Sequence, residues 1–151
     1  MKKLLFCIMG ALLLHGFSGC SNDDGDFPSQ ESSMLFKTWM LVSYGNESNE
    51  VQKESKGYYY MISFNPDGTY VGNIYGNKMW GEYKFTDSQI TINHPCTTKV
   101  FYEGSDSDEF FLEHISDVHT YAVSGTELRL YYSEKQYFKF RIKTATGDSK
   151  P

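Results

Sequence analysis

The segment Asn77-Lys-Met-Trp-Gly81-Glu-Tyr83 lies near the start of the stretch that decides the fold, which runs from Tyr75 to Phe140. After it come Thr98-Lys-Val-Phe-Tyr102-Glu-Gly104, Glu109-Phe-Phe-Leu-Glu-His-Ile115, Tyr121-Ala-Val-Ser-Gly125 and Leu128-Arg-Leu130. Alternating apolar runs, polar breaks and one amphipathic run follow one another here. This order predicts a strand, a loop, a single helix, a strand and a hairpin.

Short runs of aromatic and β-branched residues, separated by turn residues, continue on both sides of this stretch and are typical of strands. Eight runs fit: 35–44, 58–64, 69–74, 80–85, 89–93, 119–124, 127–132 and 136–142. Residues 45–56 are polar and without periodicity, which predicts a loop. In the first run Met40, Val42 and Tyr44 form the more apolar of two alternating sets, although Trp39 is poorly suited to a solvated face.

One amphipathic helix is expected at about residues 106–116. Its start is rich in Ser and Asp, which cap free backbone N–H groups and favour the positive end of the helix dipole. Phe111, Ile115 and Val118 follow at helical spacing and form one apolar stripe. The fold class is therefore mainly β (α+β): a curved antiparallel sheet or small open barrel of about eight strands with one packed α-helix.

The first twenty residues have the features of an export signal. Lys2 and Lys3 precede an apolar run over residues 4–14, which is too short to span a bilayer as a mature helix. The run ends in Phe17-Ser-Gly-Cys20, which resembles the bacterial lipobox with Phe17 where Leu is usual. Cys20 is therefore the predicted lipidation site. Several acyl chains on one residue suffice for stable membrane anchoring.

Four segments follow from these features. Residues 1–19 are a lipoprotein signal peptide, 20–33 the lipidated cysteine and a flexible acidic tether, 34–143 the domain, and 144–151 a disordered tail. Acidic residues after a lipidated cysteine resemble the surface-export signal of Bacteroidetes lipoproteins, and a plain tether explains them equally well. The expected location is the outer membrane, with surface exposure left open.

Charge and cysteine content narrow the possible partners. The chain has 14 basic and 19 acidic residues, and loss of the two signal lysines changes its formal charge from −5 to −7. An acidic chain repels phosphate, so nucleic acid is not an expected partner. After cleavage before Cys20, only Cys96 remains besides the lipidated residue, so no disulfide is expected within the chain.

The motif Asn77-x-x-x-Gly81-x-Tyr83, together with Thr98, the single helix and the strand order, resembles the META domain over roughly residues 36–140. This family includes the HslJ-like heat-shock lipoproteins. Family members often carry two cysteines where this chain has Gly76 and Tyr102. The resemblance implies a small envelope module linked to stress or envelope integrity, and it carries over no catalytic residues.

Candidate reactive side chains are few. His94, Cys96, His114 and His119 form a conceivable zinc set, but three separate segments would have to converge, so no metal or cofactor is expected. Cys96 beside His94 lacks an evident orienting acid or oxyanion hole, so no catalytic pair is expected.

Glu109 and Glu113 are helically spaced and are read as the solvated face of the helix.

Five aromatic residues are the candidate lining of a ligand cup: Trp80, Tyr58, Tyr60, Tyr70 and Tyr83. Aromatic side chains in a small β domain also serve as core. Three functional hypotheses remain. The first is a non-catalytic, monomeric envelope lipoprotein that binds the membrane through its lipid and contacts an envelope protein. The second is a lipocalin-like binder of a small apolar or sugar ligand, and the third is a hydrolase or protease inhibitor.

Overall fold

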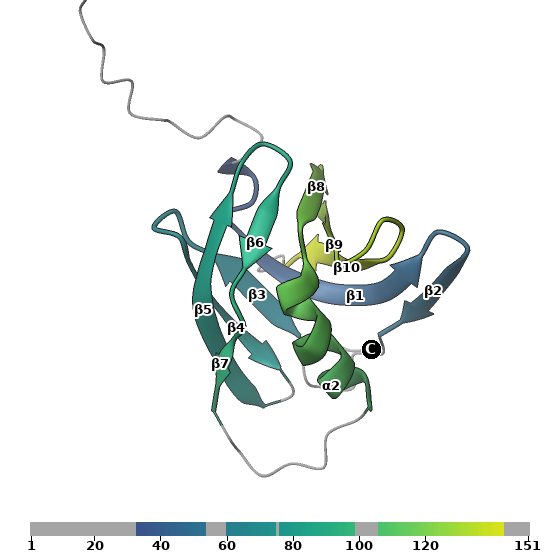
Figure 1. Cartoon of the computed structure of the whole chain (residues 1–151), viewed down its shortest axis with the longest axis horizontal. Coiled ribbons are helices and arrows are strands. Elements are labelled where there is room, and N and C mark those ends of the chain that lie inside the picture. Colours follow the sequence, from purple (N-terminus) through teal and green to yellow (C-terminus); the bar gives the residue numbers. More distant parts are fainter. Residues whose placement is uncertain (1–32, 54–59, 75, 99–105, 144–151) are drawn as a thin grey trace, which may run out of the picture.

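The computed structural model describes residues 33–53, 60–74, 76–98 and 106–143. These residues form a strongly curved antiparallel sheet with a short helix at its open side (Figure 1). The elements are β1 (Thr38–Asn46), β2 (Asn49–Gln52), β3 (Met61–Phe64), β4 (Thr69–Ile74), β5 (Asn77–Phe85), β6 (Ile90–Ile92), β7 (Cys96–Thr97), α2 (Asp106–His114), the 3-10 turn η1 (Ile115–Asp117), β8 (Thr120–Ser124), β9 (Glu127–Tyr131) and β10 (Tyr137–Ile142).

The sheet is nearly closed into a barrel. Its strand order is β6-β5-β4-β3-β1-β10-β9-β8, and all pairs are antiparallel. The seam lies between β6 and β8. Two backbone hydrogen bonds cross it, from Ile90 N to His119 O at 3.1 Å and from Tyr121 N to Ser88 O at 3.2 Å. The predicted curved antiparallel sheet or open barrel is therefore confirmed.

The sheet has ten strands in the described residues, two more than the eight runs predicted. Residues 45–56 are not simply a loop, because β2 lies there and pairs with the end of β1. Asn46 Oδ1 accepts from the N–H groups of Ser48 and Asn49 and closes this hairpin. Since β2 is a short polar edge strand, it leaves little apolar periodicity in the sequence. The second addition, β7, pairs with β5 after the Pro95 break.

The first strand corrects the predicted alternation. Leu41 pairs with Phe140 and Ser43 pairs with Lys139, so a β-bulge lies between these positions. A bulge shifts the side-chain alternation by one residue. Trp39 and Leu41 therefore face the core before it, and Tyr44, opposite the buried Phe138, faces the core side after it. The buried residues Trp39, Leu41 and Ser43 form the less apolar of the two alternating sets. Ser43 is buried beyond the bulge, where its Oγ donates to Glu50 Oε1 at 2.6 Å.

The predicted helix is confirmed as α2 followed by η1. Phe111, Ile115 and Val118 are buried, as the apolar stripe predicted. The ring of Phe111 lies 4.9 Å from that of Phe138 and 6.3 Å from that of Tyr60. The helix therefore contributes its apolar face to the same core that the strands enclose.

A turn with a strong sequence signal leads from β3 to β4. Gly68 has a φ of 83°, and its N–H donates to Asn65 O at 3.2 Å. Asp67 Oδ1 accepts from Thr69 N at 3.0 Å and from Thr69 Oγ1 at 2.6 Å. The Thr69 hydroxyl and N–H hold the pKa of the Asp67 carboxyl below its ordinary value. Residues 65–68 thus form a turn in which Asp67 and Gly68 have the roles typical of these residue types.

Candidate functional site

The four residues of the sequence motif act as hydrogen-bonding and packing positions around β5. At its start, Thr98 Oγ1 donates to Asn77 Oδ1 at 3.1 Å and accepts from Lys78 N at 3.0 Å. A backbone bond from Thr98 N to Lys78 O, also 3.0 Å, lies beside them. Asn77 and Thr98, twenty-one residues apart, therefore join the start of β5 to the segment that follows β7.

Gly81 makes room for an aromatic ring. It pairs with Tyr70 across β4 and β5, and a Cβ at this position would lie 2.6 Å from the Tyr70 hydroxyl oxygen. The Tyr70 hydroxyl continues past the glycine and donates to Asn93 O at 2.8 Å. The close approach at Gly81 is therefore made by a side chain and not by backbone.

Tyr83 fastens the turn between β3 and β4. Its hydroxyl donates to Asn65 O at 2.7 Å, and its N–H donates to Gly68 O at 2.8 Å. Burial, with a smaller contribution from the negative charge of Asp67, raises the pKa of Tyr83 to about 12. Burial also raises the pKa of Tyr70 far above its ordinary value. Both hydroxyls are held as neutral donors, which suits structural anchors.

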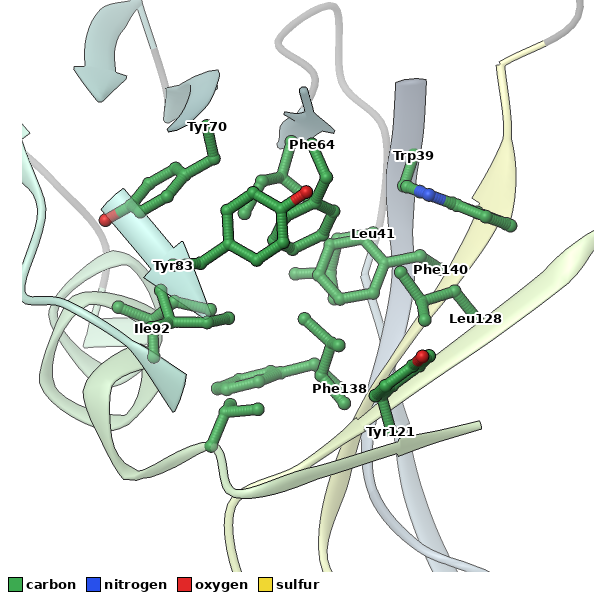
Figure 2. Close-up of a cluster of buried hydrophobic side chains, with 14 of the residues drawn as sticks. Trp39, Leu41, Phe64, Tyr70, Tyr83, Ile92, Tyr121, Leu128, Phe138 and Phe140 are labelled. Carbon is green, nitrogen blue, oxygen red and sulfur yellow. The ribbon is translucent and has the colours of Figure 1, made fainter. Parts of the chain in front are cut away.

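The five predicted cup residues do not line one cavity. Tyr60, Tyr70 and Tyr83 are buried, whereas Trp80 is 44% exposed. Trp80 and Tyr83 are three positions apart on one strand, so their side chains point to opposite faces of the sheet. Tyr70 and Tyr83 point into the aromatic and aliphatic cluster beside Phe64 and Ile92 (Figure 2). Tyr58 lies outside the described residues.

The interior of the barrel is occupied by side chains. The ring of Phe64 lies 4.8 Å from that of Tyr83 and 6.3 Å from that of Tyr70. Trp39, Phe138 and Phe140 are fully buried in the same cluster. Figure 2 shows Phe64 and Tyr83 next to one another in the cluster, with Trp39 and Tyr70 at its two edges.

Each of the three histidines in the described ranges lies within hydrogen-bond distance of a polar oxygen. His94 Nδ1 lies 3.2 Å from Ser116 Oγ, His114 Nδ1 lies 2.8 Å from Asp117 Oδ2, and His119 Nδ1 lies 3.0 Å from Asp117 O. Cys96 is an exposed free thiol. Within the described ranges, no three His, Cys, Asp or Glu side chains gather in a way that could hold a metal ion.

Glu109 and Glu113 are both exposed on α2.

An open groove on the outer face of the sheet is a candidate for ligand binding that was not predicted from the sequence. It encloses about 470 Å³ over the outside of β1, β3, β4 and β5. The described residues that line it are Thr38, Met61, Ser63, Val71, Gly72, Asn73, Lys78, Met79 and Trp80. The signal was present in the sequence, because Val71 and Trp80 occupy the outward positions of two strands whose inward positions hold Tyr70 and Met79.

The strand register explains how these residues meet. Trp80 lies opposite Val71, Val71 opposite Ser63, and Ser63 opposite Thr38, which makes one row across four strands.

Lys78 lies opposite Asn73, and Asn73 lies opposite Met61, which makes a second row beside the first. The Thr38 and Ser63 hydroxyls are 2.8 Å apart and hydrogen-bonded to one another. The two rows together form a surface with an indole at one end and small polar groups at the other.

A second hollow of about 520 Å³ lies between the tip of the β1–β2 hairpin and the end of β9. Its walls carry Glu47, Glu134 and Lys135. Tyr137 forms part of it, and the Arg129 guanidinium carbon lies 4.9 Å from the centre of that ring. In contrast to the Trp80 groove, the lining of this hollow carries charged groups of both signs.

The part of the chain that the structure describes includes the nine-residue helix α2. None of its helices combines the length and the apolar character needed to cross a bilayer.

Comparison with known structures supports the fold. A DUF4847 family protein from Bacteroides vulgatus ATCC 8482 is 20% identical, with a TM-score of 0.55 over 71% of this chain and 92% of that one. A protein from Burkholderia xenovorans solved by NMR is 13% identical, with a TM-score of 0.62 over 95% and 99% of the two chains. Identities this low establish a shared fold alone.

Comparison with families gives a more specific result. No curated protein matches the chain. The model of the META domain matches residues 32–144, which is most of the sequence and includes the Asn77, Gly81, Tyr83 and Thr98 positions. The chain therefore belongs to the META domain family.

Proposed function

We propose that this protein is a non-catalytic, lipid-anchored lipoprotein of the cell envelope whose META domain acts as an interaction module. In this proposal the domain binds through its outer surface and not through the barrel interior. The observation that carries the proposal is the filled interior of the barrel. Tyr70, Tyr83 and Phe138 all belong to the one core cluster that occupies it.

The packing argues against the lipocalin-like alternative. A binder of that kind needs an interior cavity of several hundred cubic ångströms, within the range of roughly 300–1,000 Å³ typical of small-ligand sites. Here the rings of Phe111 and Phe138 are 4.9 Å apart, and Phe140 is fully buried beside them. Opening such a cavity would require removing aromatic contacts that the core depends on.

The anchoring part of the proposal comes from the sequence. The lipobox-like Phe17-Ser-Gly-Cys20 follows a basic and then an apolar segment, in the order of a lipoprotein signal. The tether of residues 21–33 would reach at most roughly 45 Å when fully extended. A domain on such a tether stays close to the membrane surface, where an envelope partner would be found.

Metabolic labelling with a fatty-acid analogue tests the anchor. Wild-type protein and the matched Cys7→Ala variant should incorporate the label and sediment with outer membranes. Cys20→Ala should incorporate no label and should appear in the soluble fraction, because the acylated sulfur is lost. Label on Cys20→Ala, or its absence from the wild type, would contradict the lipid anchor.

A further inference from the structure

We propose that the outer-face groove beside Trp80 is a saccharide-binding site that accepts a neutral or acidic sugar of one or two rings. The inference rests on the proposed function, because it names the surface and the ligand class of the interaction module. It does not require the lipid anchor.

The indole of Trp80 supplies the stacking surface. It is 44% exposed on a sheet face, directly opposite Val71, which is 49% exposed. The C–H groups on one face of a pyranose carry partial positive charge, and the face of an aromatic ring is negative. A sugar ring laid on Trp80 therefore gains both apolar burial and electrostatic attraction.

The rest of the groove offers polar groups suited to hydroxyls. Asn73 provides an amide, Lys78 an ammonium group, and Thr38 with Ser63 a pair of hydroxyls. An acyl chain in this position would bury the amide and the ammonium without partners, which is unfavourable. The described lining contains no carboxylate, so it favours a neutral or acidic sugar over a cationic one.

The position of the groove argues against a peptide ligand. It lies on the face of β4, whose two neighbours β3 and β5 both pair with it. Backbone groups used in the ladder are unavailable to a peptide that binds by adding a strand, since this mode needs a free sheet edge. The volume of about 470 Å³ suits a ligand of small-molecule size.

Tryptophan fluorescence gives a direct test because the chain has only two tryptophans. Trp39 is fully buried, with its Nε1 donating to Leu35 O at 2.8 Å, so its emission should stay constant. The full-length protein, in a detergent without a sugar headgroup, is titrated with maltose, cellobiose, lactose and glucuronic acid. At least one of these sugars should shift the Trp80 emission and protect it from a soluble quencher. The dissociation constant should be on the order of 1 mM for so open a site.

Ligand-observed saturation-transfer NMR then measures sugar binding without using Trp80 as the fluorescent reporter. Trp80→Ala should weaken binding by about tenfold or more, because the stacking area is lost. Val71→Ala should weaken it less, and Val51→Ala is the matched control, since Val51 is a similarly exposed valine on β2. That control should leave affinity unchanged.

Three outcomes would overturn the proposal. They are no response to any of the four sugars at several tens of millimolar, equal binding by Trp80→Ala and wild type, or protection of Trp80 by an unstructured apolar peptide or by lipid vesicles but not by sugar. Because the fatty-acid labelling reports on Cys20 and the titration reports on Trp80, the failure of either test is distinguishable from the failure of the other.

Discussion

Gly81 is required by space, since its neighbour Tyr70 occupies the volume that a side chain would need. The ring atoms Cζ and Cε1 of Tyr70 would lie 2.7 and 2.8 Å from an added Cβ. Tyr70 is fully buried and hydrogen-bonded to Asn93 O, so it has little freedom to move aside. Overpacking of this kind typically costs about 1–3 kcal/mol.

Gly81→Ala should therefore lower the free energy of unfolding in urea by about 1–3 kcal/mol. The control is a double-mutant cycle with Tyr70→Leu, which removes the ring that causes the clash. Gly81→Ala should cost clearly less in the Tyr70→Leu background. An equal cost in both backgrounds would show that the ring is not the reason for the glycine.

Ionisation of Tyr83 makes the free energy of unfolding depend on pH in the alkaline range. Its pKa is raised by burial from about 10 in the unfolded chain to about 12 in the folded protein. The folded state thus holds the phenol proton more tightly. The stabilisation of the folded state that follows from this pKa difference is fully present below pH 10. It is lost as the pH rises from 10 to 12, and a two-unit shift corresponds to roughly 2–3 kcal/mol.

Urea unfolding of wild type and Tyr83→Phe at several pH values from 8 to 11.5 measures this linkage. Tyr83→Phe should be less stable at pH 8 by about 1 kcal/mol, because the bond to Asn65 O is lost. Above pH 10 the difference should shrink, since the variant has no phenol to ionise at this position. A constant difference across the range would contradict the assignment.

At the scale of elements, α2 covers the open side of the barrel. Phe111 is 2% exposed and lies within 4.9–6.4 Å, ring centre to ring centre, of Phe138, Tyr60 and Phe140. Phe110 lies beside it and contacts the Tyr44 ring at 5.0 Å. A nine-residue helix is too short to be stable alone in water, so these contacts with the strands keep it in place.

Phe111→Ala should lower the free energy of unfolding by about 3–5 kcal/mol, through lost burial and the cavity left behind. Glu109→Ala, on the exposed side of the same helix, is the matched control and should change stability by no more than about 0.5 kcal/mol. Thermal unfolding followed by circular dichroism measures both. Similar effects from the two substitutions would mean that α2 does not close the core.

The elements also show which sequence signals were sufficient. The i, i+4, i+7 spacing of Phe111, Ile115 and Val118 predicted the helix and its buried face, because one helix face repeats at that interval. In β1 the more apolar alternating set is not the buried one, and a bulge between Leu41 and Ser43 places Tyr44 opposite Phe138. The bulge depends on how β1 pairs with β10, nearly a hundred residues away, which local periodicity does not record.

At the scale of the whole molecule, the curvature of the sheet separates the aromatic side chains of the interior from the side chains that remain on the outer surface. Strands β6 and β8, at the two ends of the strand order, meet at the seam, so every strand between them has one face inside and one outside. Tyr70 and Tyr83 therefore serve the core, and Val71 and Trp80 are left on the outer surface. The interior is therefore filled by core side chains, and the groove beside Trp80 lies on the outside.

The sequence by itself determined the family, the mainly β class, the amphipathic helix and the structural motif around Asn77, Gly81, Tyr83 and Thr98. These features rest on local spacing and on residue types that suit one backbone conformation. Only the tertiary structure decided that Trp80 faces away from the tyrosines, that Asn77 bonds Thr98 and that Thr38, Ser63, Asn73 and Lys78 share a groove. Such neighbours come from four strands, and their meeting depends on register and closure, which are set by the packing of the whole core.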